Sequence, residues 1–324
     1  MFELLFWVVV FAVALGVMVK GADLFLSGAE RIGLDLGFSP FVIGVFVVGV
    51  GTSLPELTSG IVALIEGAPE IVTANAVGSN VTNIFLVGGI IAVLGGKIAI
   101  TRNLLDAELP FFVISTSLFL AVAFDGEVTF VEALMLAATY AVYLSYLFST
   151  DVRGEHDLVI EAEEKVIKRE RRLLKYLPHG TSFLLALAGL GALVLGAKFV
   201  VDAVVALAAI LGLTTGVIAM IAIALGTSLP EVSVSVRALQ TGKFAVALGN
   251  LFGSNAFNVL LAVGIPGLFA TLPLGPSTFA VGVPMLAVAS VIYLVIGLAQ
   301  KMYRWEGVLF LILYLFFVLK LVGA

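Results

Sequence analysis

The hexapeptide Gly-Thr-Ser-Leu-Pro-Glu occurs twice in this 324-residue chain, at residues 51–56 and again at 226–231. A second motif, Gly-Ser-Asn-x-x-Asn, also occurs twice, at 78–83 and 253–258, and the spacing from first copy to second copy is the same for both motifs. Two long identities in one register are not expected by chance. The sequence therefore contains an internal duplication, and the fold is expected to consist of two related halves.

The composition is that of a membrane protein. Hydrophobic residues make up 61% of the chain and charged residues 12%, and the mean hydropathy is +1.19, whereas soluble domains carry about 25% charged residues. The apolar content is enough for about ten membrane-crossing helices of about 20 residues each. A net charge of −5 without a long basic run makes a nucleic-acid partner unexpected, and the absence of cysteine excludes disulfides and thiolate metal sites.

Turn residues and charges divide the chain into two sets of five apolar runs. These lie near 3–27, 39–65, 70–95, 108–123, 128–148, 181–207, 214–238, 243–269, 276–298 and 304–322. Because each set has an odd number of spans, the second half must enter the membrane from the opposite side, as in the inverted repeats of secondary transporters. We therefore expect an all-α membrane protein of ten transmembrane helices in two inverted five-helix repeats, with broken helices at an ion site.

The expected domains follow from this division. Residues 1–148 and 181–324 form the two repeats, whose most similar parts are 39–95 and 214–269, and the charged segment 149–180 is a linker. If the N-terminus is outside the cell, the inner loops and the linker hold 14 of the 17 Lys and Arg residues, which agrees with the positive-inside rule. This predicts a multi-pass protein of the cell membrane with both termini outside and a cytoplasmic linker, acting as a connector or as a regulatory site.

Two glutamates occupy the middle of otherwise uncharged spans. Glu56 and Glu231 end the two copies of the hexapeptide. A charged side chain at the centre of a bilayer costs at least about 2.5 kcal/mol and usually marks a functional site. Both glutamates are therefore candidate ion ligands.

The prolines before these glutamates are expected to free backbone carbonyl groups. Pro55 and Pro230 lack the N–H that would bond four residues back, which predicts a break in each helix near Gly51 and Gly226. Free carbonyl groups at membrane depth must face protein, water or an ion. With nearby hydroxyl groups they form an oxygen-only ligand set, which suits hard cations. The hydroxyls belong to Thr52, Ser53, Thr227 and Ser228.

The second motif adds polar side chains. Ser79 and Asn83, like Ser254 and Asn258, are four residues apart and share one helical face. They serve either as polar contacts between helices or as ion ligands, and the duplication favours a shared midplane site. Two ionised glutamates would be neutralised by one calcium or two sodium ions, so competition for one pair of carboxylates would support exchange. Magnesium is less suitable because it demands octahedral geometry.

The paired motifs resemble the two alpha-repeats of the sodium/calcium exchanger family, within the cation/calcium exchanger superfamily. The resemblance covers nearly the whole chain and implies ions bound between spans two, three, seven and eight. It implies that Glu56 and Glu231 bind calcium together with the backbone carbonyls of Thr52 and Thr227. It implies one sodium site from Gly49, Thr52, Glu56, Ser79 and Ser228, another from Ser53, Ala224, Thr227, Glu231 and Ser254, and a middle position lined by Asn83 and Asn258. Some microbial members have aspartate in place of Asn258, and this difference disfavours potassium co-transport.

The resemblance also implies that spans one and six slide across a rigid core to alternate access. Both spans are glycine-rich, and each carries a Lys and an Asp: Lys20 with Asp23, and Lys198 with Asp202. We expect Lys198 and Asp202 to form an ion pair across one helical turn, either structural or part of a gate.

The sequence therefore favours an antiporter that exchanges sodium for calcium, with proton-coupled calcium transport as the alternative. An intramembrane enzyme is not supported, since the spans lack a Ser/His or Ser/Lys dyad, paired aspartates or a histidine-rich motif. Composition does not separate a carrier from a channel. The expected partners are calcium, sodium and the lipid bilayer, without a cofactor or an obligate protein partner.

Overall fold

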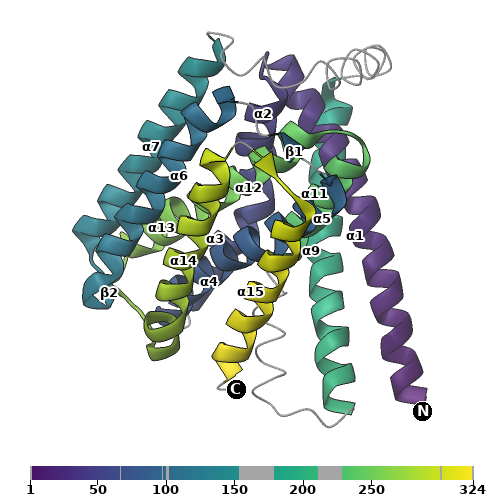
Figure 1. Cartoon of the computed structure of the whole chain (residues 1–324). Helices are drawn as coiled ribbons and strands as arrows, with labels where there is room; N and C mark the ends of the chain where they lie inside the picture. The colour runs from purple at the N-terminus through teal and green to yellow at the C-terminus, as the bar shows by residue number, and fades with distance from the viewer. Residues whose placement is uncertain are drawn as a thin grey trace.

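The computed structural model describes residues 2–65, 67–96, 98–99, 102–152, 179–210, 228–299 and 301–322, which are almost entirely helical (Figure 1). The elements of the first half are α1 (Phe2–Asp35), α2 (Pro40–Val42), η1 (Ile43–Val48), α3 (Gly49–Ile65), α4 (Glu70–Thr82), η2 (Asn83–Val87), α5 (Gly88–Gly95), β1 (Ile98–Ala99), α6 (Arg102–Val122), η3 (Ala123–Asp125), β2 (Glu127–Val128) and α7 (Phe130–Val152). Those of the second half are α9 (His179–Ile210), α11 (Leu229–Gln240), α12 (Phe244–Phe257), η4 (Asn258–Ala262), α13 (Val263–Gly267), β3 (Leu272–Pro273), η5 (Thr278–Gly282), α14 (Val283–Leu298), β4 (Lys301–Met302) and α15 (Arg304–Val322).

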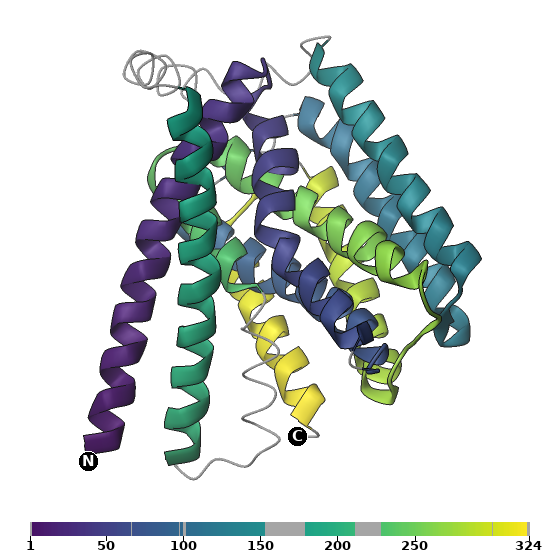
Figure 2. The same ribbon diagram turned by 180° about the vertical axis from the view of Figure 1, so that it is seen from behind.

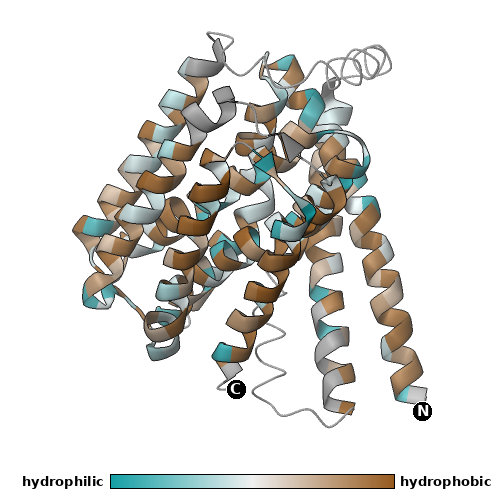
Figure 3. Cartoon of the chain, in the orientation of Figure 1, coloured by the Kyte–Doolittle hydropathy of each residue, from teal (hydrophilic) through white to brown (hydrophobic). Residues whose placement is uncertain are grey.

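The protein is an integral membrane protein with a buried central layer. Within the described ranges, seven helical stretches are long and apolar enough to cross a membrane. In the most apolar part of Phe244–Gly267, 94% of the residues are buried inside the protein, whereas only 17% are buried in the corresponding part of Glu3–Asp35. An apolar helix that is not covered by protein must be covered by lipid, so α12, η4 and α13 lie at the centre and α1 lies at the periphery. The outer helix α15 is hydrophobic along most of its length and hydrophilic toward its ends (Figure 3).

Helices α1 and α9 form an antiparallel pair that stands beside the other helices (Figures 1 and 2). Glycines permit this close packing: a β-carbon at Gly189 would lie 2.2 Å from the backbone nitrogen of Phe25, and one at Gly28 would lie 2.5 Å from that of Ala186. The pair reaches the central layer chiefly through the contacts of α1 with η1 and α11. The first helices of the two halves thus run in opposite directions.

The helix that carries Glu56 is continuous through Pro55, so the predicted break at this proline is wrong. The departure from α-helical geometry lies upstream, in the π-helical segment η1, where the N–H of Gly49 bonds to the carbonyl of Gly44. Surrounding packing can hold a helix that lacks one hydrogen bond, which explains why the proline does not interrupt it. Pro230 lies in the first turn of α11, and residues 211–227, including Gly226, lie outside the described residues.

Two further π-helical segments begin at the last asparagine of each Gly-Ser-Asn-x-x-Asn motif. Segment η2 begins at Asn83 and η4 begins at Asn258. Single π-helical turns inside α-helices occur frequently at functional sites. Identical sequence positions in the two halves therefore have the same uncommon backbone form.

Short antiparallel ribbons join the loops of the two halves. Strand β1 pairs with β4, and β2 pairs with β3. Glu132 and Glu306 occupy corresponding positions of the two halves, 174 residues apart. They have the same role at the starts of α7 and α15: each accepts a hydrogen bond from the backbone N–H three residues earlier, at 2.8 and 2.7 Å. Such bonds satisfy groups that a helix leaves unpaired at its first turn.

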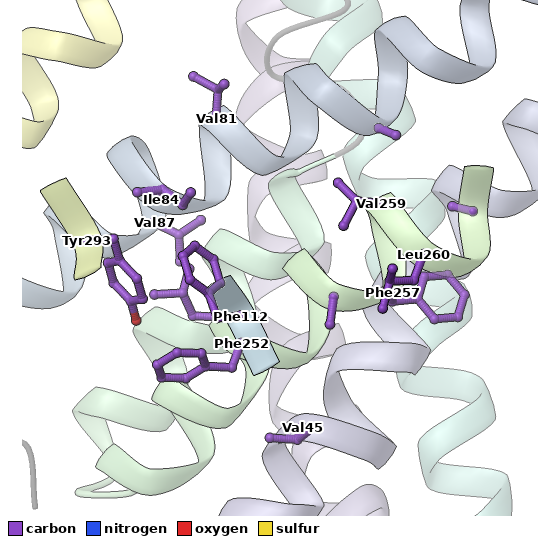
Figure 4. Close-up of a cluster of buried hydrophobic side chains, with 14 of the residues drawn as sticks. Val45, Val81, Ile84, Val87, Phe112, Phe252, Phe257, Val259, Leu260 and Tyr293 are labelled. Carbon is purple, nitrogen blue, oxygen red and sulfur yellow. The ribbon is translucent and has the colours of Figure 1, made fainter. Parts of the chain in front are cut away.

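Aromatic rings support the central helix α12 on one side. Phe252 of α12 packs against Phe112 of α6 and Tyr293 of α14, with ring centroids 6.0 and 5.5 Å apart (Figure 4). Phe112 and Tyr293 also contact each other, at 5.1 Å. This cluster holds one face of α12, and the polar motif residues lie elsewhere on the same element.

Candidate ion-binding site

The two glutamates of the repeated hexapeptide lie in the protein interior. Glu56 on α3 is 2% exposed and Glu231 on α11 is 1% exposed. Ser53, which lies three residues before Glu56 on α3, is hydrogen-bonded to the carboxyl group of Glu231. Helix α12 contacts α3, α4 and α11, and α3 also contacts α4 and α11. The structure therefore brings together two acidic side chains that come from opposite halves of the chain.

Hydroxyl groups connect the two halves at this position. Ser53 of the first half donates a hydrogen bond to Oε1 of Glu231 in the second half, at 3.0 Å. Thr52 Oγ1 lies 3.5 Å from Ser254 Oγ, and Ser254 Oγ lies 3.4 Å from the carbonyl oxygen of Gly49. Ser79 donates to Oδ1 of Asn75 at 3.4 Å, and Nδ2 of the same asparagine donates to the backbone carbonyl of Glu56. Six of the residues predicted from sequence thus share one buried polar region with Glu56.

Several polar atoms in this region have no hydrogen-bond partner among the described residues. They are both carboxylate oxygens of Glu56, Oε2 of Glu231, the hydroxyl of Ser228 and the amide groups of Asn83 and Asn258. Burying such groups without a partner is costly, and native proteins rarely leave them so. Carboxylate, amide and hydroxyl oxygens are the ligands that hard cations such as calcium take. The donor set therefore fits a cation, and each of these side chains is at most 2% exposed.

Two asparagines that were not predicted as ligands bond to the helical turns that carry the two glutamates. Asn250 donates from Nδ2 to Ser235 Oγ at 2.9 Å and to the backbone carbonyl of Glu231 at 3.4 Å. Asn75 donates to Ser59 Oγ at 2.9 Å and to the backbone carbonyl of Glu56 at 3.4 Å. The available signal in the sequence was that Asn75 and Asn250 are separated by the same spacing as the repeated motifs.

A third matched pair of asparagines joins the central helices to each other. Asn80 Nδ2 donates to the backbone carbonyl of Asn255 at 3.0 Å, and Asn255 donates to the carbonyl of Leu251 in its own helix at 2.8 Å. Both side chains are buried. These residues belong to the Gly-Ser-Asn-x-x-Asn motif, and Asn80 serves as a polar contact between α4 and α12.

Two predicted ligands, Ala224 and Thr227, lie outside the described residues. The predicted ion pair between Lys198 and Asp202 is wrong: in the described part of α9, the Lys198 ammonium lies 5.9 Å from the ring centroid of Phe199 instead. A lysine that precedes its acidic partner by four residues has the less favourable order on a helix.

Ion pairs instead tie α1 to the central layer. Asp23 pairs with Arg237 of α11, and Lys20 lies 3.9 Å from Asp23. Further along α1, Glu30 pairs with Lys243 before α12 at 2.5 Å, and both side chains are buried. Asp23 and Glu30 are seven residues apart, so they lie on the same face of α1. This face holds α1 against α11 and α12.

Comparison with known proteins shows which family this chain resembles. The family model described as sodium/calcium exchanger protein matches residues 6–149 and 181–323, which leaves out only the charged segment between the halves and the chain ends. The chain is 32% identical to the sodium/calcium exchanger MaX1 of Methanosarcina acetivorans, over 94% of this chain and 95% of that one. It is also 32% identical to the uncharacterized membrane protein MJ0091 of Methanocaldococcus jannaschii, over 94% of both chains.

Solved structures of a sodium-calcium exchanger are also similar to this chain over nearly its whole length. The structure of the sodium-calcium exchanger NCX_Mj soaked with sodium and strontium is similar to this chain with a TM-score of 0.77 and 30% identity, over 97% of both chains. A second structure of the same exchanger, soaked with 2.5 mM Na⁺ and 0.1 mM Sr²⁺, is similar with a TM-score of 0.79 and 29% identity.

Proposed function

Because this chain belongs to the sodium/calcium exchanger family of membrane cation exchangers, we propose that it is a sodium-driven calcium antiporter in which both ions compete for one site between Glu56 and Glu231. The observation that carries this proposal is the burial of the two carboxyl groups at one place, with Ser53 of one half bonded to Glu231 of the other. A site shared by both halves can be exposed to either side of the membrane in turn.

The proposed calcium ligands are the carboxylates of Glu56 and Glu231 and the backbone carbonyls of Thr52 and Thr227. The proposed sodium ligands also include the carbonyls of Gly49 and Ala224 and the side chains of Ser53, Ser79, Asn83, Ser228, Ser254 and Asn258. Two carboxylates neutralise one calcium ion or two sodium ions. Because the ligands overlap, a bound calcium ion and bound sodium ions exclude each other, which is the basis of exchange. The donor set supplies oxygen atoms only, so no cofactor is needed for this chemistry.

The proposed architecture is ten transmembrane helices in two inverted repeats, 1–148 and 181–324. Three features support it: α1 and α9 are antiparallel, the π-helical segments η2 and η4 begin at matched positions, and the ribbon β1–β4 has its counterpart in β2–β3. The start of α1 and the end of α15 lie at the same end of the molecule (Figures 1 and 2). With the positive-inside rule, we place both termini outside and the linker 149–180 in the cytoplasm.

Alternating access in this proposal arises from sliding of the α1–α9 pair along the central layer. The pair is closely packed within itself at Gly21, Gly28, Gly189 and Gly196. Among the described residues, its contacts with the rest of the molecule include the two ion pairs from Asp23 and Glu30, the contacts of α1 with α2, η1 and α11, and those of α9 with α3 and α11. A unit whose two helices pack this closely against each other can move as one body.

The test is calcium uptake by the purified protein in sealed vesicles. Wild type should take up radioactive calcium only when a sodium gradient is imposed, and Glu56→Gln and Glu231→Gln should each reduce uptake by at least about 100-fold, because they remove a charged ligand. Glu127→Gln provides the matched control, since Glu127 lies exposed in strand β2. Full uptake in either site variant would refute the assignment of the site. Uptake driven by a pH gradient without sodium would instead identify proton coupling.

A further inference from the structure

The amide groups of Asn250 and Asn75 contact the proposed site in the same way. The Oδ1 atom of Asn250 accepts a hydrogen bond from Thr52 Oγ1 at 3.1 Å and lies 3.4 Å from the Ser254 hydroxyl. The Oδ1 atom of Asn75 accepts from Ser79 Oγ at 3.4 Å. The hydroxyls of Ser254 and Ser79 are proposed sodium ligands, and Thr52 is a proposed ligand through its backbone carbonyl, whereas neither asparagine is itself among the proposed ligands.

The opposite end of each amide is also held. Nδ2 of Asn250 donates to Ser235 and to the backbone carbonyl of Glu231, and Nδ2 of Asn75 donates to Ser59 and to the backbone carbonyl of Glu56. These bonds set the orientation of each amide, because the NH₂ group donates and the oxygen accepts. They also tie each amide to the helical turn that carries the glutamate.

The fixed orientation of each amide determines the direction in which the neighbouring hydroxyl group donates its proton. A hydroxyl has one proton and two lone pairs. When Thr52 donates its proton to Asn250, at a shorter distance than its 3.4 Å contact with the Gly49 carbonyl, its lone pairs point elsewhere and are available to a cation. A hydroxyl without such an acceptor could turn its proton toward the cation, and the partial positive charge of that proton would repel the cation.

We propose that Asn250 and Asn75 are positioning residues that direct the hydroxyl lone pairs of Thr52, Ser254 and Ser79 toward the transported sodium ions. This inference rests on the proposed function and adds two residues to it. Calcium binding should depend on them less, since its proposed ligands are carboxylates and backbone carbonyls, which have no proton to direct. Asn250 should matter more than Asn75, because it is fully buried and faces two of these hydroxyls, including one from the opposite half.

The experiment measures half-saturation constants for sodium and for calcium separately in reconstituted protein. Asn250→Ala and Asn75→Ala should raise the sodium constant by about 10- to 100-fold, the usual effect of removing a residue that orients a metal ligand, and leave the calcium constant near its wild-type value. Asn250→Asp keeps an acceptor for the hydroxyls, and the Ser235 hydroxyl can turn to donate to it. This variant should restore the wild-type sodium constant or lower it.

The matched control is Asn80→Ala, which removes a buried asparagine of α4 that bonds to a backbone carbonyl of α12. The effect of Asn80→Ala reports the loss of packing alone, so the sodium and calcium constants should change by the same factor or both stay unchanged. The proposal is overturned if the Asn250 and Asn75 variants change both constants by the same factor, or change neither. If Asn250→Ala does not fold, the sodium and calcium constants of Asn75→Ala decide, because Asn75 is only half-buried. If the wild-type protein takes up calcium without a sodium gradient, the proposed function is overturned. If wild-type uptake depends on sodium but the Asn250 and Asn75 variants behave like Asn80→Ala, only this inference is overturned.

Discussion

Gly253 is the residue at which a single added methyl group should do the most damage to the site. It lies on α12 where this helix crosses η1, directly before Ser254. A β-carbon at Gly253 would lie 2.1 Å from the carbonyl oxygen of Val45, and ordinary contact begins at 3.4 Å. The atom in the way belongs to the backbone, so no side chain can rotate to make room. Gly253→Ala must therefore push the two segments apart by the difference between these two distances, which is more than an ångström.

The expected losses of stability and of transport rate follow from this displacement. Overpacking of a buried position costs about 1–3 kcal/mol, and alanine regains about 1 kcal/mol through its higher helix propensity, so the net loss of stability is modest. The effect on transport should be larger. Ser254 contacts the Gly49 carbonyl and the Thr52 hydroxyl at 3.4 and 3.5 Å, and a displacement of this size breaks both contacts. Misplacement by about 1 Å can reduce a rate by about 100-fold.

The assay is sodium-dependent calcium uptake in vesicles, with thermal unfolding in detergent measured in parallel. Gly60→Ala is the matched control, because Gly60 is also buried, lies four residues after Glu56 on α3, and would place its β-carbon at an ordinary 3.6 Å from Val72. We expect the control to retain uptake and to melt at the same or a higher temperature. If Gly253→Ala transports and melts like Gly60→Ala, the close crossing of α12 and η1 is refuted.

Two further predictions concern stability. Lys243→Met removes the lysine that pairs with the buried Glu30 and should lower the free energy of unfolding by about 1.5–3 kcal/mol, the range for losing a hydrogen bond to a charged group, whereas the double variant Glu30→Met, Lys243→Met should lose less because it leaves no carboxylate buried. Thermal melts of both proteins in detergent check this, and an equal loss in the two would contradict it. Glu132→Ala removes the bond from the Thr129 N–H and should cost about 0.5–2 kcal/mol without changing calcium uptake. Glu132→Gln keeps an acceptor and should melt like wild type; if it melts like Glu132→Ala, the cap does not explain the loss.

Much of the architecture could be predicted because it depends on the composition of the chain and on the spacing of residues along it. The membrane location follows from the long apolar runs, since lipid tolerates few charges. The duplication follows from one constant offset, and it led directly to Glu56 and Glu231. The capping glutamates Glu132 and Glu306 were also matched in sequence, although their role became clear only from their contacts with the backbone.

The wrong expectations share one cause, which is that they treated a local pattern as decisive. Pro55 does remove a hydrogen bond, yet α3 continues through it because neighbouring helices hold the segment in place. Lys198 and Asp202 have the spacing of an ion pair, but the lysine lies over Phe199. Asp23 pairs instead with Arg237, which is far away in the chain. Local spacing sets which contacts are possible, and it does not set which of them form.

The sequence by itself determined that this is a membrane protein of two related halves, each with one acidic residue in the middle of a span, because these properties depend on residue type and spacing along the chain. Only the tertiary structure decided that Ser53 meets Glu231, that Asn75 and Asn250 hold the hydroxyls beside the site, and that η1 crosses α12 through glycine. These contacts depend on how two distant segments approach each other in space, and that approach is set by the packing of the whole bundle.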